Sequence, residues 1–173
     1  LGTCFLLLLA GIDTTWSAFG SSLLHLATHP EDQALLRAEP DLIDSAVEEL
    51  LRVYSPVTMA REVIADVDVA GCPMKPGDKV LMSFPAANRD PAQFEDPDEF
   101  IIDRERNRHV AFGSGIHRCL GSNLARMELR VAIQEWLTRI PTFELADPAA
   151  VTWTGGQVRG PRTIPVRWSV TQP

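Results

Sequence analysis

Cysteine is scarce in this chain, and the three that occur, Cys4, Cys72 and Cys119, are widely spaced and form no Cys-x-x-Cys pair. An odd, scattered set argues against a disulfide framework and against structural zinc, which needs four protein ligands. This cysteine usage is typical of proteins in a reducing compartment, so we predict a cytoplasmic protein.

Positive charge is also in short supply, because 16 lysines and arginines stand against 23 acidic residues, which gives a net charge of −7. This balance argues against a nucleic-acid binder and against a general affinity for anionic membranes. The apolar run Leu1–Ile12 is too short to span a bilayer and lacks the basic start of a secretory signal. We therefore predict no membrane span and expect this run to form a buried helix.

The spacing of apolar residues over the 173-residue chain predicts a fold that is mainly α with small antiparallel β-sheets. Predicted helices cover residues 1–29, 30–36, 41–54 and 120–139. Predicted strands form a small sheet within residues 58–84, and further strands lie within 142–168, the last of them over 163–168, with a hairpin near Gly155 and Gly156. Residues 87–121 should be irregular. On the last helix we expect these apolar side chains to face the core: Leu120, Leu124, Met127, Val131 and Leu137.

The stretch from Phe112 to Gly121 reads Phe-Gly-Ser-Gly-Ile-His-Arg-Cys-Leu-Gly and directly precedes the last predicted helix. Cys119 lies where that helix begins, beside the basic residues His117 and Arg118. Positive neighbours and a helix N-terminus both stabilise a thiolate, and the glycines let backbone N–H groups approach the sulfur. A lone thiolate on a tight loop suits a soft, redox-active metal. For an isolated cysteine, the alternative is a buried structural residue.

A second unusual stretch, Ala10-Gly11-Ile12-Asp13-Thr14-Thr15, interrupts the first predicted helix. Gly11 costs about 1 kcal/mol relative to alanine inside a helix, and Asp13 places a carboxylate in an apolar segment. A sequence that accepts such costs usually gains function at that point. The alternative is a glycine for close packing and a Thr14 hydroxyl that donates to the Ala10 carbonyl one turn earlier.

The ordered pattern Phe112-x-x-Gly115-x-x-x-Cys119-x-Gly121, with His117 before the cysteine, resembles the haem-binding signature of the cytochrome P450 haem-thiolate monooxygenases. The stretch from Ala10 to Thr15 resembles the oxygen-activation motif on the distal helix of the same family. The resemblance covers essentially all of residues 1–173 as the C-terminal part of the P450 fold, of the bacterial soluble type. It is also similar to the haem domain of self-sufficient fused forms. It implies an N-terminal portion that this sequence does not include.

The resemblance implies a role for each matching residue. Cys119 would be the axial ligand of the iron of haem b, within a loop that includes Phe112 and Gly115, and Arg61 and His117 would pair with the haem propionates. On the distal helix, Ala10 and Gly11 would border the oxygen site and the helix would widen locally, while Thr14 and Asp13 would deliver protons. Two further sets are implied. A buried structural network would contain Glu49, Arg52 and Arg104. The substrate pocket would include Val57, Thr58, Met59, Gln157 and Val158.

The implied function is a monooxygenase that inserts one oxygen atom from O2 into a small apolar organic substrate, by hydroxylation or oxidative demethylation. Electrons would come from NAD(P)H through a separate or fused reductase, by way of a ferredoxin or flavin-type partner. This partner would dock on a basic patch of Arg118, Arg126 and Arg130, which could equally be ordinary solvated arginines. The alternative function is an incomplete, non-catalytic haem-binding module, but the presence of Asp13 and Thr14 favours an enzyme.

Overall fold

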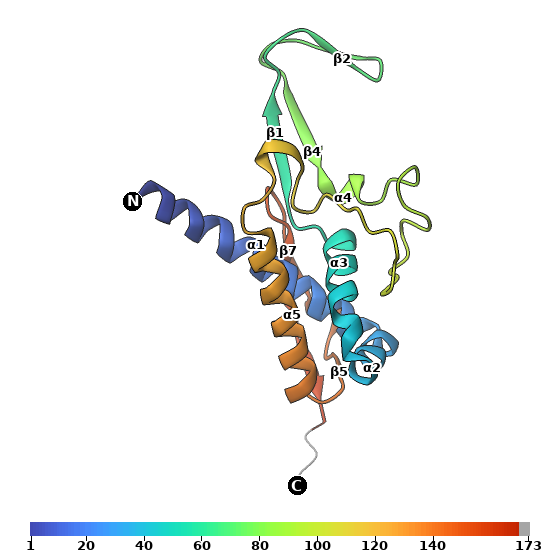
Figure 1. Cartoon of the computed structure of the whole chain (residues 1–173). Helices are drawn as coiled ribbons and strands as arrows, with labels where there is room; N and C mark the ends of the chain where they lie inside the picture. Colours follow the sequence, from blue (N-terminus) through green and yellow to red (C-terminus); the bar gives the residue numbers. More distant parts are fainter. Residues whose placement is uncertain (170–173) are drawn as a thin grey trace.

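A computed structural model describes residues 1–169 of the chain, and it confirms a helix-rich fold with small antiparallel sheets (Figure 1). The helices are α1 (Gly2–Thr28), α2 (Pro30–Ala38), α3 (Ile43–Val53), α4 (Phe84–Ala87) and α5 (Ser122–Arg139). Short 3-10 turns lie at η1 (Pro40–Leu42), η2 (Gly115–His117) and η3 (Pro148–Ala150). The predicted helices are therefore present, with ends that differ by a few residues.

The strands of residues 1–169 pair as small antiparallel hairpins and ladders. β1 (Thr58–Glu62) pairs with β4 (Lys79–Ser83), and β2 (Val67–Val69) with β3 (Cys72–Met74). β5 (Phe143–Leu145) pairs with β8 (Val166–Trp168), and β6 (Thr152–Thr154) with β7 (Gly160–Thr163), so the hairpin predicted near Gly155 is confirmed. The prediction of one strand over residues 163–168 is wrong. Pro165 lacks an N–H and separates β7 from β8, which take different partners.

The core lies where the C-terminal half of α1 meets α2, α3 and α5 (Figure 1). α3 buries an apolar stripe, which consists of Ile43, Ala46, Val47, Leu50 and Leu51. On α5 the predicted buried face is largely wrong. Of its members only Leu137 is buried, alongside Leu129 and Ile133, while Leu120, Leu124, Met127 and Val131 are exposed. α5 carries apolar residues on more than one face, and the face that packs against the core is the one with Leu129, Ile133 and Leu137, each four residues from the next.

The first half of α1 is exposed, so the prediction of a buried helix over Leu1–Ile12 is wrong within this chain. Figure 1 shows this half projecting from the body of the molecule. Burial begins near Ser17, where a Cβ on Gly160 of β7 would lie only 2.4 Å from the Ser17 Cβ. By length and composition alone, α1 could cross a membrane, a test that the core helices of soluble proteins also pass. α1 is also continuously α-helical, without the predicted widening near Gly11.

A buried ionic network fixes the irregular segment that leads to Cys119. Both Arg52 and Glu49 on α3 are 0% exposed, and the guanidinium donates to the two carboxylate oxygens at 2.8 Å each. Arg104 Nε donates to Glu49 Oε1 at 3.0 Å, so the predicted trio lies together. Burial alone would raise the pKa of Glu49, but hydrogen bonds from Arg52, the Ile101 N–H and Arg104 lower it, and the carboxylate stays ionised.

We predict that Glu49→Gln lowers the free energy of unfolding by about 3–5 kcal/mol, because it leaves the Arg52 guanidinium buried without a counter-charge. Denaturant titration of the purified variant measures this change. The matched control is Glu135→Gln, which breaks the exposed pair of Glu135 and Arg139 on α5 and should change stability by less than about 0.5 kcal/mol. Equal effects of the two substitutions would contradict the buried network.

A second buried polar group, His25, lies near the end of α1. Its Nδ1 is 2.9 Å from the Tyr54 hydroxyl, its Nε2 is 2.8 Å from Asp32 Oδ2, and its ring stacks on His29 at 4.1 Å between centroids. Burial lowers the pKa of His25 below 6.5, although the hydrogen bond with Asp32 opposes this shift. The folded chain therefore holds His25 in its neutral form.

Lowering the pH below about 6.5 should therefore destabilise the fold, because the unfolded chain protonates His25 at a pH where the folded chain still resists the proton. We expect the free energy of unfolding to be constant above the unfolded pKa, to fall as the pH drops from there toward the lowered folded pKa, and to level off below it. Urea titrations between pH 8 and pH 5 test this. In His25→Gln this component of the pH dependence should disappear, and an unchanged profile would show that His25 does not cause it.

Candidate functional site

The loop before α5 presents Cys119 at the surface. Gly113 and Gly115 have φ values of +68° and +69°, in the left-handed region that favours glycine, and they turn the chain through η2. The Cys119 N–H donates to the Phe112 carbonyl at 2.9 Å, which closes the loop at its base. Gly121 is the N-cap of α5, so the cysteine lies two residues before the cap and three before the first helical residue, Ser122. The thiol is exposed, which excludes the reading of a buried structural cysteine.

The surface around this thiol is apolar and open. Ile116 and Leu120 of the loop are 98% and 93% exposed, and a Cβ added at Gly115 would meet no atom within 4 Å. Within residues 1–169, no group of three or more His, Cys, Asp or Glu side chains lies close enough together to hold a metal ion. A soft thiolate beside an open apolar surface fits a flat, apolar macrocycle with its own metal.

Of the two residues predicted to pair with propionates, Arg61 lies exposed on β1 and donates to the Ala60 carbonyl at 2.8 Å. His117 lies exposed in η2, two residues before Cys119. Both cations are therefore accessible at the surface, and neither forms an ion pair with an acidic side chain in the described part of the chain.

The side chains of the motif on α1 make three contacts, of which the longest joins Thr15 Oγ1 to Glu128 Oε2 at 3.5 Å. Thr14 Oγ1 donates to the Ala10 carbonyl at 2.6 Å, as expected for a helical threonine that bonds back one turn. The Asp13 carboxylate accepts from Arg162 Nη1 at 2.7 Å, and Arg162 Nε donates to Thr154 Oγ1 at 3.0 Å. The hydrogen bond with Asp13 raises the pKa of Arg162. Arg162 was not predicted, because 149 residues separate it from its partner.

The residues predicted for a substrate pocket lie together where β1 meets the loop between β6 and β7. Val57 and Val158 form an isolated antiparallel bridge, and the Thr58 N–H donates to the Gln157 carbonyl at 2.9 Å. The Gln157 side chain lies 3.5 Å from the sulfur of Met59. The structure thus joins two segments that are about 100 positions apart in the sequence.

The predicted basic patch is partly neutralised. Arg126 donates to both carboxylate oxygens of Glu48, at 2.5 and 2.9 Å, and its guanidinium lies 4.6 Å from the centre of the Phe112 ring. Arg130 faces Asp44 at 3.6 Å. Arg118 lines a hollow of about 470 Å³ beside Arg126 and the loop. α3 therefore supplies acidic partners for two of the three arginines.

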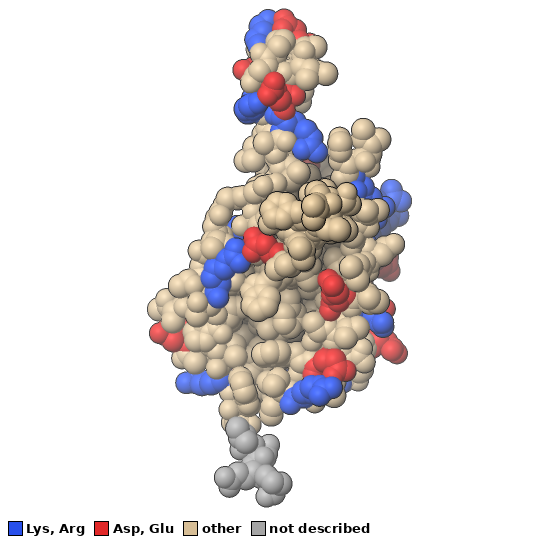
Figure 2. Space-filling model, turned by 90° about the vertical axis from the view of Figure 1, so that its left-hand side faces the viewer, with Lys and Arg blue, Asp and Glu red and all other residues tan. Residues whose placement is uncertain are grey.

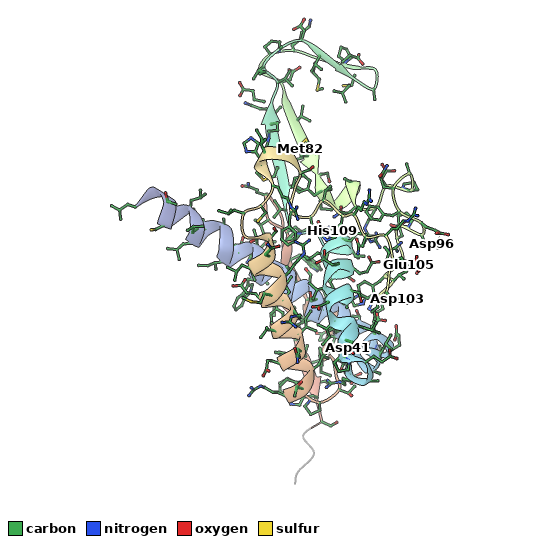
Figure 3. All side chains as sticks on the ribbon, in the orientation of Figure 1. Asp41, Met82, Asp96, Asp103, Glu105 and His109 are labelled. Carbon is green, nitrogen blue, oxygen red and sulfur yellow. The ribbon has the colours of Figure 1, made fainter. Side chains whose placement is uncertain are left out.

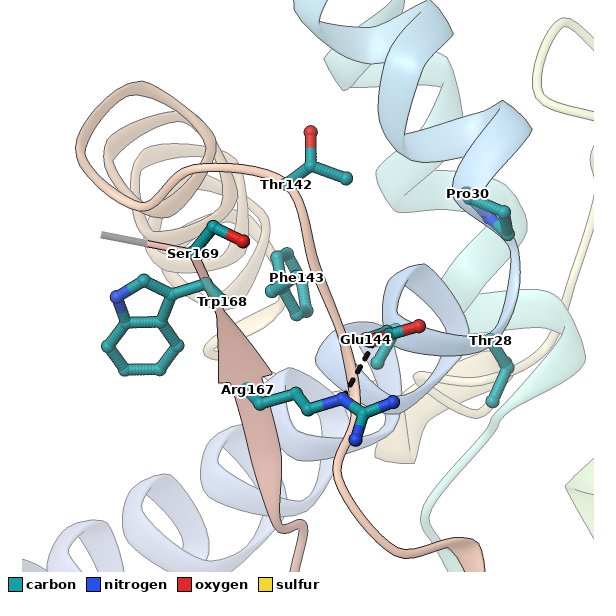
Figure 4. A pocket seen from close by; sticks show the side chains of 9 residues that line it. Thr28, Pro30, Thr142, Phe143, Glu144, Arg167, Trp168 and Ser169 are labelled. Atoms are coloured by element: carbon teal, nitrogen blue, oxygen red, sulfur yellow. Dashed lines mark hydrogen bonds and ion pairs between the residues drawn. The ribbon is translucent and has the colours of Figure 1, made fainter. Parts of the chain in front are cut away.

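Figures 2 and 4 show two further parts of the surface. Figure 2 looks at the side from which α1 projects, where most side chains are uncharged and acidic and basic side chains are scattered among them, including an acidic group beside a basic one near the middle. A separate hollow of about 570 Å³ lies between the α1–α2 junction and the strands β5 and β8, where Arg167 Nε donates to Glu144 Oε1 at 2.8 Å (Figure 4). This second hollow contains none of the predicted site residues.

Comparison with known proteins gives a consistent result. The family model described as Cytochrome P450 matches residues 1–148. Cytochrome P450 105C1 of a Streptomyces species is 48% identical over 168 residues, which cover 95% of this chain and 44% of that protein. The biotin biosynthesis cytochrome P450 of Bacillus subtilis is 48% identical over 146 residues, covering 84% of this chain and 37% of that protein.

Among solved structures, cytochrome P450 CYP101C1 superposes with a TM-score of 0.91 at 46% identity, covering 96% of this chain and 43% of that one. The chain thus spans less than half the length of these relatives.

Proposed function

Because the chain belongs to the cytochrome P450 family, we propose that it forms the haem-binding C-terminal part of a monooxygenase of the bacterial soluble type, in the cytoplasm. The observation that carries this proposal is the exposed Cys119 on a glycine-turned loop at the start of α5. Asp13 and Thr14 on α1 favour a catalytic protein over a non-catalytic haem-binding module.

In this proposal Cys119 would hold the iron of haem b through its sulfur, and the backbone at Phe112 and Gly115 would shape the loop that presents it. Arg61 and His117 would pair with the two propionates, since cations suit the carboxylates of an otherwise apolar group. When bound, the haem would supply the activation of O2, and a thiolate ligand favours cleavage of the O–O bond. The role of the protein would be to position this chemistry.

In this proposal, residues of α1 deliver protons to the oxygen site. Ala10 and Gly11 would leave room for the oxygen site, because neither has a bulky side chain. The Thr14 hydroxyl, held at the Ala10 carbonyl, would deliver a proton to this site, and Asp13 would relay protons from solvent. Arg162 pairs with one oxygen of Asp13, Oδ1, at 2.7 Å, so the second oxygen would be available to the relay. The ion pair therefore provides a defined resting position for Asp13.

We propose a small apolar organic substrate, bound against Val57, Thr58, Met59, Gln157 and Val158. Two electrons would come from NAD(P)H through a ferredoxin or flavin-type partner or a fused reductase. The docking surface centres on Arg118, with Arg126 and Arg130 contributing less charge, because Glu48 and Asp44 pair with them. The exposed apolar half of α1 would be covered by an upstream part of a longer protein, since residues 1–173 match less than half of the relatives.

Cys119→Ser should remove the thiolate-type Soret band of the ferrous carbonyl complex, because a hydroxyl is a much weaker ligand for a soft metal. Visible spectra of the haem-loaded protein under carbon monoxide give the result. The matched control is Cys72→Ser, which changes an exposed cysteine on the β2–β3 hairpin and should leave the spectrum unchanged. If the thiolate-type band persists in Cys119→Ser, Cys119 is not the ligand.

Thr14→Ala should leave haem binding intact but divert electrons from product into hydrogen peroxide, lowering the rate of product formation by about 10²-fold, the lower end for a lost proton-transfer group. The measurement compares NAD(P)H consumed, peroxide released and product formed. Thr28→Ala is a matched control, because Thr28 also donates to the carbonyl one turn earlier on α1. Full coupling of electrons to product in Thr14→Ala would exclude this residue from proton delivery.

A further inference from the structure

Two adjacent carboxylates on α3, Glu48 and Glu49, serve different partners. Glu49 accepts hydrogen bonds from Arg52 and Arg104 in the buried network described above. Glu48 instead accepts from Arg126 on α5 and from His109 Nε2 at 3.0 Å. Burial alone would raise the pKa of Glu48, but the hydrogen bonds from His109 and Arg126 lower it to about 2, so this carboxylate is ionised at neutral pH.

These two glutamates hold alternate residues of the segment that leads to the cysteine loop. Asn107 Nδ2 donates to Glu49 Oε2 at 3.0 Å, and His109, two residues further on, contacts Glu48. The His109 side chain is only 2% exposed, and Figure 3 shows it in the interior of the molecule, whereas Asp96 and Glu105 lie on the outer side of the irregular segment. α3 therefore fixes the path of the chain just before Phe112.

The contacts of His109 define its tautomer. The Ala111 N–H donates to Nδ1 at 3.2 Å, so Nδ1 carries no proton, and Nε2 therefore carries the proton donated to Glu48. The His109 ring thus links the Glu48 carboxylate to the backbone of residue 111. The next residue, Phe112, accepts the Cys119 N–H, so the link continues to the backbone of the predicted ligand.

Glu48 also acts on Phe112 through a second route. Its two oxygens hold the Arg126 guanidinium in a bidentate geometry, and this guanidinium lies 4.6 Å from the centre of the Phe112 ring. Such a geometry favours one orientation of the cation, which in turn favours one position of the aromatic ring. The same carboxylate therefore helps to fix both the backbone of residue 111 and the side chain of Phe112.

We infer that Glu48 is a positioning residue for the haem ligand: through His109 and Arg126 it fixes residues 109–113, and thereby the Cys119 backbone that presents the sulfur. This inference rests on the proposed function, since it concerns the thiolate ligand. It assigns to Glu48 a role separate from that of the Glu49 network, although the two side chains are neighbours in sequence.

The test compares Glu48→Gln with Asp44→Asn in the haem-loaded protein. Asp44 is a matched control, because its carboxylate on α3 also pairs with an α5 arginine, Arg130, but within residues 1–169 Asp44 makes no hydrogen bond to the loop. We expect Glu48→Gln to speed amide hydrogen exchange of peptides covering residues 109–119 about ten-fold, which corresponds to about 1.4 kcal/mol. The share of the ferrous carbonyl complex without the thiolate-type Soret band should also rise. Asp44→Asn should change neither quantity.

The outcomes are distinct. If the unmodified protein itself lacks a thiolate-type carbonyl spectrum, the proposed function fails. If the unmodified protein has that spectrum and Glu48→Gln matches it in both measurements, the proposed function survives and the positioning role is refuted. If Glu48→Gln does not fold, Arg126→Gln and His109→Gln decide by the same two measurements, because each removes one of the two links to Glu48. If neither variant changes the exchange or the spectrum, the role is refuted.

Discussion

The structure depends on a buried negative charge at the end of α3. A buried carboxylate is tolerated only where hydrogen-bond donors surround it, and Glu49 is surrounded by Arg52, Arg104, Asn107 and the Ile101 N–H. The two arginines use their remaining donors on backbone carbonyls of the irregular segment, which are those of Asn88, Glu95, Asp96, Pro97 and Glu99. One carboxylate thereby organises a stretch that has almost no regular structure.

This arrangement explains how a long irregular segment can lead to a well-defined loop. Backbone groups outside helices and strands need other partners, and here arginine side chains supply them. Asn88 continues the pattern, because its side chain accepts the Val110 N–H at 2.7 Å and donates to Ser55 at 2.9 Å. The segment therefore ends at Phe112 in a position determined by α3, although about 60 residues separate the two in sequence.

Local patterns in the sequence predicted much of this fold. The helices, the hairpin at Gly155 and the trio of Glu49, Arg52 and Arg104 could be predicted because each depends on spacing, turn residues or a recognisable motif. The face that α5 buries could not, since apolar residues lie on more than one side of it and periodicity alone cannot say which side is covered. For the same reason the exposure of Leu1–Ile12 was missed. Burial depends on what packs against a helix.

Polar contacts between residues far apart in the sequence are the other feature that the sequence did not predict. The pairs that Asp13 forms with Arg162 and that Glu48 forms with Arg126 join residues 149 and 78 positions apart, and single side chains at such distances leave no local pattern. Glu48 could also be read from the sequence as part of an exposed i, i+4 pair with Arg52, a pair the structure does not form, because Arg52 turns to Glu49. Only the fold decides between such alternatives.

The two sides of the proposed haem site differ in how they are supported. On the cysteine side, Glu48, Glu49 and their partners are all supplied by α3, α5 and the segment between β4 and the loop, so the position of Cys119 is determined within this chain. On the α1 side, residues 1–16 have little packed against them, and the Asp13–Arg162 pair and the hydrogen bond from Thr15 Oγ1 to Glu128 tie the motif to the body. An apolar helix face in water is costly in proportion to its area. In the proposed site, the positions of the α1 residues would therefore depend on what covers α1, whereas the position of the cysteine loop would not.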